Sequence, residues 1–177
     1  MKPEARLWAS VRTHLKRDLD RLDRVENAVA DGQPDVNGCI QGEDVWIELK
    51  APSEPKRATT ALMANNHKLL QSQVNWFARQ RQAGGIAFIL LRTETLLLLV
   101  DGTKHADNFN SMTVAKMKAS ALFAATVPTP QQQWSLLRNV IFTASRYRRL
   151  HQHASAQLML DELERRKEGM ADHRYKK

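Results

Sequence analysis

The sequence lacks the features that mark several common protein classes. It has one cysteine, Cys39, among its 177 residues, which excludes an internal disulfide and a zinc site built from several thiolates. The apolar run Leu96–Val100 is far too short to span a bilayer, and no signal peptide is evident. A glycine-rich phosphate loop, a Ser-His-Asp order and zinc-finger spacings are also missing. We therefore expect an intracellular, cytoplasmic protein with no membrane segment.

Positive charge, in contrast, is abundant. The chain carries 27 lysines and arginines against 19 acidic residues, a formal net charge of +8, which suits a polyanionic partner. Between residues 51 and 92 the bases are opposed by Glu54 alone, and basic side chains there could contact phosphates without reading a base sequence. A solvated basic surface is the alternative. The predicted DNA-contacting residues are Lys56, Arg57, Lys68, Arg79 and Arg81.

Alternating apolar and polar side chains predict a β-hairpin with strands over residues 35–41 and 44–50. Gly42-Glu43 is expected to form a two-residue type II′ turn, whose twist matches that of the strands. This register would place Asp35 opposite Lys50. Because residues directly opposite each other share a face, the polar side chains would point one way and the apolar ones into a core.

Three side chains on the polar face of this hairpin suggest phosphodiester chemistry: Asp35, Glu48 and Lys50. Mg²⁺ is a hard cation that is commonly held by one or two carboxylates, waters and substrate phosphate. Such an ion polarises a phosphoryl oxygen and lowers the pKa of a bound water, while a nearby ammonium can offset charge that develops on the phosphate. The Pro-Asp turn or the Glu-x-Lys pair alone would be weak evidence, because Pro-Asp turns and exposed Glu-x-Lys pairs are common. Together they predict Mg²⁺-assisted phosphodiester hydrolysis.

Pro34-Asp35 and Glu48-Leu49-Lys50 resemble the signature of the PD-(D/E)xK nuclease superfamily. Over about residues 1–102 the chain is most similar to small phage and bacterial enzymes related to the VRR-NUC domain and the archaeal-type Holliday junction resolvases. The resemblance implies that Asp35, Glu48 and the Leu49 carbonyl bind Mg²⁺, with Mn²⁺ as a substitute, and that Lys50 assists the attacking water. Whether one ion or two act is open. The preceding strand lacks the double arginine that names VRR-NUC, so the subfamily is open too.

Two residues outside the motif resemble further members of that site. Glu4 is similar to an acidic residue on the first helix, and Gln73 to the glutamine on the helix after the motif lysine. The resemblance implies that both complete the catalytic site. A carboxylate in the first turn of a helix also suits the helix dipole without any catalytic role. Gln73 could simply bond to backbone, and Gln71 is a competitor for its place.

The resemblance implies an α/β, restriction-endonuclease-like fold, with a mixed β-sheet core in the order αβββαββ and a C-terminal helical extension. Residues 1–102 would be the nuclease core, and 103–177 the extension with its charged tail. The residue patterns predict helices over 3–20 and 66–83, a loop over 51–65, and strands over 23–29, 86–91 and 96–100 in addition to the hairpin.

The extension is expected to begin with one helix over 112–125. Thr129-Pro130 then offers the capping residue and first-turn proline of a second helix. Three arginines farther along this helix either grip nucleic acid or face solvent: Arg146, Arg148 and Arg149. Such an extension could serve as a dimerisation arm, a DNA clamp or a dock for a host protein.

These residues predict a metal-dependent endodeoxyribonuclease that acts on branched or otherwise structured DNA. The related resolvases further suggest a phage-encoded homodimer that works in the host cytoplasm. A nuclease of the same fold that nicks DNA or degrades host DNA is the second hypothesis. The third is a nucleic-acid or host-protein binding module without turnover. The intact set of Asp35, Glu48 and Lys50 favours the first two.

Overall fold

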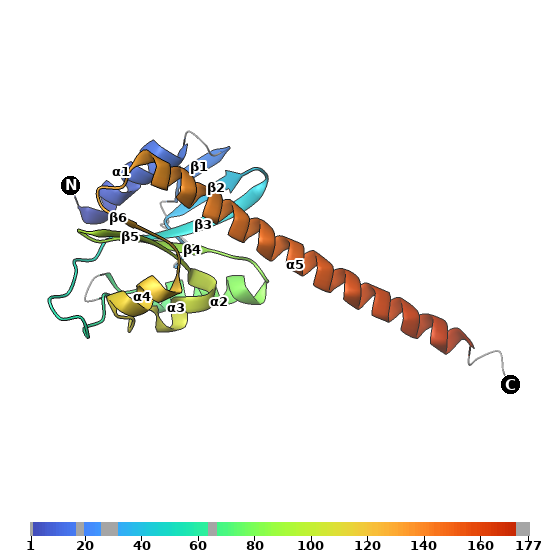
Figure 1. The fold of residues 1–177 in the computed structure, drawn as a ribbon. Coiled ribbons are helices and arrows are strands. Elements are labelled where there is room, and N and C mark those ends of the chain that lie inside the picture. Colours follow the sequence, from blue (N-terminus) through green and yellow to red (C-terminus); the bar gives the residue numbers. More distant parts are fainter. Residues whose placement is uncertain (1, 17–19, 26–31, 64–66, 173–177) are drawn as a thin grey trace.

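Groups of one to three strands lie between helices along the described chain (Figure 1). The computed structural model describes residues 2–16, 20–25, 32–63 and 67–172. The helices are α1 (Pro3–Leu15), α2 (Gln71–Gln82), α3 (Gly102–Phe109), α4 (Val114–Ser120) and α5 (Gln131–Asp172). The strands are β1 (Arg21–Arg24), β2 (Val36–Ile40), β3 (Glu43–Lys50), β4 (Phe88–Arg92), β5 (Leu96–Asp101) and β6 (Ala121–Thr126).

The six strands form one mixed sheet in the order β1-β2-β3-β4-β5-β6. β3 and β4 run parallel because α2 crosses between them, and the other neighbouring pairs are antiparallel. α1 and the first part of α5 cover one face, while α2, α3 and α4 cover the other (Figure 1). The mixed α/β class, and the order αβββαββ as far as β5, are confirmed.

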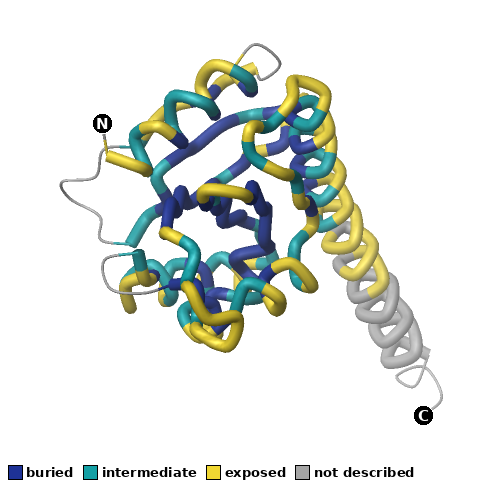
Figure 2. Tube along the Cα trace, turned by 60° about the vertical axis from the view of Figure 1, so that its left-hand side comes forward, coloured by how far each residue is buried: buried dark blue, intermediate teal, exposed yellow. Residues whose placement is uncertain are grey.

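Two apolar cores lie on the two faces of the sheet. β4 and β5 are nearly continuous in apolar residues because their alternate side chains enter opposite cores. Phe88 and Leu97 belong to the core under α1 and α5, whereas Ile89 and Leu98 belong to the core under α2, α3 and α4. In Figure 2 these central strands are the dark tube enclosed by paler helices.

The hairpin forms, but its turn and register differ from the prediction. Gln41 and Gly42 both have positive φ, 49° and 80°, as the two central residues of a type I′ turn require. The predicted turn at Gly42-Glu43 is therefore wrong. Ile40 pairs with Glu43, which displaces each pairing by two residues from the expected one. A displacement of two keeps every side chain on its expected face, and so the polar face of the hairpin is unchanged.

Several predicted element ends are wrong by a few residues. α1 ends at Leu15 rather than at residue 20, and α2 begins at Gln71 rather than at residue 66. β1 begins earlier than predicted, and residues 26–29 of the strand predicted over 23–29 lie outside the described residues. At the start of α2 the side chain of Gln73 accepts from the backbone N–H of Leu70, which caps the helix there.

The largest correction concerns the helix predicted over 112–125. α4 ends at Ser120, and the next six residues form β6 along the open edge of β5. This alanine-rich segment adopts a strand because pairing satisfies the backbone of β5 and places Phe123 in the core under α5. The sheet and both cores thus continue past residue 102, and the predicted extension supplies a strand and two short helices to them.

α5 runs unbroken to Asp172, and its second half projects away from the sheet (Figure 1). Trp134, Leu137 and Ile141 in its first half are buried. Arg148 lies 3.4 Å from Asp101, and Arg149 lies 2.6 Å from Glu43. Two of the three arginines considered for nucleic-acid contact therefore hold the helix on the sheet. Among the described residues, no helix is long and apolar enough to cross a membrane.

Candidate active site

Glu48 and Lys50 lie at the end of β3, on the face that α2 covers. Being two residues apart on one strand, they point the same way, and their exposed fractions are 1% and 7%. Lys50 Nζ lies 2.8 Å from Glu48 Oε1. Removing both charges from water is costly, so a buried pair of this kind is weak evidence for a purely stabilising role.

Gln73, the third residue of α2, joins this pair. Its Nε2 donates to Glu48 Oε1 over 2.6 Å, and its Oε1 accepts from Lys50 Nζ over 3.3 Å. The same Oε1 accepts from the backbone N–H of Leu70 over 3.0 Å, which satisfies a donor at the start of the helix. Gln71 instead bonds within its own helix. The structure therefore brings Gln73, rather than Gln71, to the predicted site.

Asp35 reaches the same end of β3 from the loop before β2. Its Oδ2 accepts from the backbone N–H of Leu49 over 2.9 Å, which anchors the loop beside Glu48. Earlier in the same loop, Gly32 packs closely on the start of α2, where a Cβ would lie 2.3 Å from the backbone of Ser72. The predicted aspartate and glutamate are thus brought together.

Burial controls the charge of both carboxyl groups. It raises the pKa of Glu48 from 4.5 to about 7, an effect that Lys50 opposes and Asp35 reinforces. Burial also raises the pKa of Asp35, against the hydrogen bond from Leu49 and the charge of Lys50. Glu48 Oε2 is buried and has no hydrogen-bond partner among the described groups. Such an oxygen is costly, so either a proton or a cation would complete the site.

Glu4, in the first turn of α1, lies near enough to this cluster to act on Asp35. Its charge contributes to the raised pKa of Asp35. Glu4 Oε1 lies 3.6 Å from Nδ1 of His67, a residue that the sequence analysis missed. No pattern marked this histidine, which stands just before α2. Only the tertiary fold, which brings the residues just before α2 to the first turn of α1, places it near the site.

The carboxylates fit a hard cation. Three or more His, Cys, Asp or Glu side chains do not gather into a metal-binding group anywhere in the described part of the chain. Asp35 and Glu48 nevertheless supply the two carboxylates that Mg²⁺ commonly uses together with waters and substrate oxygens. A cation at Glu48 Oε2 would replace the missing partner and hold that carboxyl group ionised. The oxygen donors suit Mg²⁺ or Mn²⁺ better than a thiolate metal.

All five basic residues predicted to contact DNA are exposed. Arg81 lies 3.0 Å from Asp107 and donates to the carbonyl of Thr103, so its charge is partly neutralised within the chain. Of the others, Lys56 and Arg57 lie on the loop that follows β3, Lys68 lies just before α2, and Arg79 lies on α2.

Comparison with known proteins assigns no family to the chain. No protein-family model matches the sequence, and no curated protein matches it. The function therefore has to be argued from the site itself. Its elements are a buried Glu-Lys-Gln network, an aspartate beside it and a glutamate on α1.

Proposed function

We propose that the protein is a Mg²⁺-dependent DNA endonuclease of the PD-(D/E)xK type with a restriction-endonuclease-like core. One observation carries the proposal: Asp35, Glu48 and Lys50 converge at the end of β3, and Glu48 keeps a buried oxygen without a partner among the described groups. Burial of a structural carboxylate normally satisfies both of its oxygens. A surface that only binds nucleic acid has no need of a buried carboxylate.

The residues at the end of β3 would divide between metal binding and activation of water. Asp35, Glu48 and the Leu49 carbonyl would hold Mg²⁺, or Mn²⁺ in its place. The bound ion supplies polarisation of a phosphoryl oxygen and a lower pKa for a coordinated water. The Lys50 ammonium, held beside Glu48, orients the attacking water and stabilises negative charge on the phosphate.

Gln73 and Glu4 act around this centre. Gln73 is a positioning residue, because its amide holds both Glu48 and Lys50 while it anchors the start of α2. Glu4, whose charge acts on Asp35 from α1, would accept a hydrogen bond from a water beside the site. Together they keep the buried pair rigid and the substrate side hydrated.

DNA is the proposed substrate because the chain has a net charge of +8 and carries exposed bases on α2, just before it and on the loop after β3. The preference for branched or structured DNA rests on the resemblance to junction resolvases. So do a phage origin, action in the host cytoplasm and a homodimer whose two sites cut paired strands.

The deciding experiment is cleavage of a DNA panel, from linear duplex and flap to four-way junction, with Mg²⁺ and with EDTA. Wild type is compared with Glu48→Gln, and with Asp44→Asn as the matched control. Asp44 is an exposed carboxylate on the same strand, and its amide variant should cut like wild type. Loss of Mg²⁺-dependent cutting in Glu48→Gln alone supports the nuclease. Metal-independent DNA binding without any cutting would instead indicate a binding module.

A further inference from the structure

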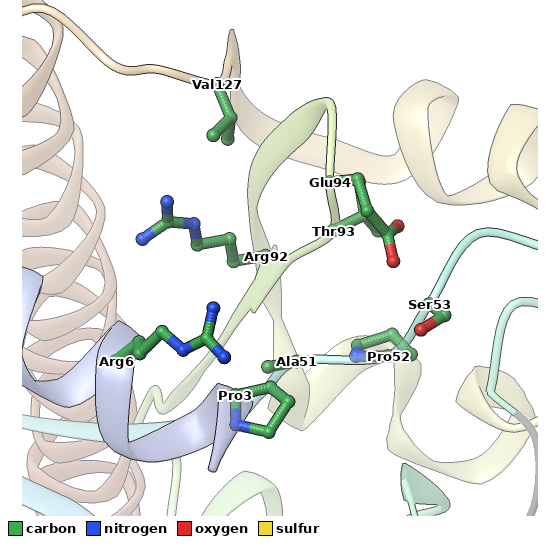
Figure 3. Close-up of a pocket in the computed structure, with 9 residues that line it drawn as sticks. All are labelled: Pro3, Arg6, Ala51, Pro52, Ser53, Arg92, Thr93, Glu94 and Val127. Carbon is green, nitrogen blue, oxygen red and sulfur yellow. The ribbon is translucent and has the colours of Figure 1, made fainter. Parts of the chain in front are cut away.

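A pocket of about 210 Å³ lies beside the candidate site, between the start of α1 and the ends of β3 and β4 (Figure 3). Ala51-Pro52, which line it, directly follow Lys50 in the chain. Pro3 and Arg6, on another wall, flank Glu4. The pocket therefore borders the proposed site while its lining contains none of the proposed catalytic side chains.

Two arginines line this pocket, Arg6 from α1 and Arg92 from the end of β4 (Figure 3). Arg92 Nη1 donates to the hydroxyl of Ser10 over 3.2 Å. Within the described ranges, no carboxylate lies within ion-pair distance of Arg92. The hydroxyl orients this guanidinium without neutralising it, and most of its N–H donors are left for another acceptor.

Glu94 is the acidic side chain on the pocket wall, and it lies across from the two arginines in Figure 3. Its Oε2 accepts from the backbone N–H of Glu54 over 3.0 Å, and this bond holds the pKa of Glu94 below its ordinary value. The carboxylate is therefore ionised and held against the loop after β3. Two positive charges and one negative charge face the pocket, which favours an anion.

We propose that this pocket binds a phosphate group of a nucleic-acid strand while a neighbouring phosphate of that strand lies at the candidate active site. Arginine presents paired N–H donors that match two phosphate oxygens, and here two arginines converge. The pocket also includes Pro3, the first residue of α1, where the positive end of the helix dipole attracts an anion. The choice of a nucleic-acid strand rests on the proposed nuclease function.

Direct binding tests the pocket. Full-length protein carrying Glu48→Gln, in EDTA, is titrated with fluorescent oligonucleotides at several salt concentrations. Adding Arg6→Gln and Arg92→Gln should weaken binding by about tenfold and reduce the slope of log affinity against log salt by about one. Glu94→Gln should tighten binding by a few fold, because it removes the repelling charge. Arg12→Gln, an exposed arginine on the same helix, should change neither quantity.

Arg92→Gln could disturb the fold through the loss of its bond to Ser10. Arg6→Gln alone, at an exposed position, and Glu94→Gln alone avoid this difficulty and must still shift affinity in opposite directions. Affinities equal to that of the parent protein in both single variants would overturn the proposal.

The phosphate has two sources, a strand terminus or the interior of a strand. Oligonucleotides with a 5′-phosphate, with a 5′-hydroxyl, and as closed single-stranded circles distinguish them. An equal loss of affinity in the arginine variants on circles and linear strands supports an internal phosphodiester. A loss confined to 5′-phosphorylated strands supports a terminal phosphate.

This test separates the pocket from the nuclease proposal. If wild type cuts no DNA but the pocket variants shift affinity as expected, the nuclease proposal fails and the pocket stands. If wild type cuts with Mg²⁺ but the pocket variants change neither oligonucleotide affinity nor KM for cleavage, the pocket fails and the nuclease stands.

Discussion

Two buried glutamates on β3 lie on opposite faces of the strand and differ in their partners. Glu43 begins the strand on the side of α5, and Glu48 lies near its end on the side of α2, with exposed fractions of 5% and 1%. Glu43 Oε1 lies 2.6 Å from Nη2 of Arg149, a close ion pair although its geometry is not that of a hydrogen bond. Glu48 Oε1 contacts Lys50 and Gln73, whereas its Oε2 has no described partner.

The difference separates a carboxylate that is paired with a distant helix from one whose Oε2 has no described partner. The pair of Glu43 and Arg149 joins two elements that are far apart in the sequence, so it can hold α5 on the sheet. The pair of Glu48 and Lys50 lies within one strand, and Gln73 alone links it to α2 among the contacts described. A buried pair within one strand, with one carboxylate oxygen unsatisfied, is better explained by chemistry than by stability.

The largest expected effect is on cleavage. If the protein is the proposed nuclease, Asp35→Ala and Lys50→Ala should each reduce cleavage by about 100-fold or more, because each removes a group to which the proposal gives a role at the reacting phosphate. Glu43→Gln should leave cleavage within a few fold of wild type. Single-turnover cleavage rates with Mg²⁺, with circular dichroism as the check on folding, measure this contrast. Full activity in Asp35→Ala or Lys50→Ala would remove that residue from the site.

Titration of Glu48 should make stability depend on pH. Because its pKa rises from 4.5 in the unfolded chain to about 7 in the folded one, its stabilising effect is complete below about pH 4.5 and is lost as the pH rises through 7. Glu48→Gln cannot titrate there. In EDTA, the free energy of unfolding of Glu48→Gln relative to that of wild type should therefore increase by up to about 3 kcal/mol between about pH 5 and about pH 8.

Urea unfolding of both proteins at several pH values measures this gain. Glu43→Gln, compared in the same way, shows what loss of the other buried glutamate on β3 does. A difference between Glu48→Gln and wild type that stays constant with pH would mean that Glu48 ionises in the folded chain as it does in the unfolded one.

Breaking the pair of Glu43 and Arg149 should have a smaller effect on stability, and the size of the loss should depend on which partner is replaced. Arg149→Gln leaves the buried carboxylate of Glu43 without a cation and should lower stability by about 1–2 kcal/mol. Glu43→Gln should cost less, because the side chain of Arg149 is 50% exposed and can turn into solvent. Urea unfolding at neutral pH tests the order. A larger loss of stability in Glu43→Gln than in Arg149→Gln would mean that the Arg149 side chain, rather than the Glu43 carboxylate, is destabilised when its partner is removed.

The smallest expected effect concerns the loop after β3. Lys56→Ala together with Arg57→Ala should weaken DNA binding by a few fold and lower its salt dependence, since each phosphate contact contributes about 0.9 to the slope. Cleavage at saturating DNA should be unchanged. Binding isotherms from low to high salt measure the slope. An unchanged slope would place this loop outside the interface.

Local patterns predicted much of the fold, and their failures have physical causes. The alternation along β2 and β3 identified the correct faces even though the turn was misplaced, because a two-residue displacement preserves the strand period. The segment that forms β6 was mistaken for helix, since its alanines favour a helix locally while the free edge of β5 and the core pocket for Phe123 favour a strand. An edge that needs a partner is not visible in a short stretch of sequence.

The sequence by itself determined which side chains of the hairpin share a face, because the period of a strand is a local property of the backbone. Only the tertiary structure decided that Gln73 joins Glu48 and Lys50, and that burial raises the pKa of Glu48 to about 7. It also decided that Arg6 and Arg92 line one pocket. These features depend on how separate elements pack, and packing sets the burial and the charges around each group.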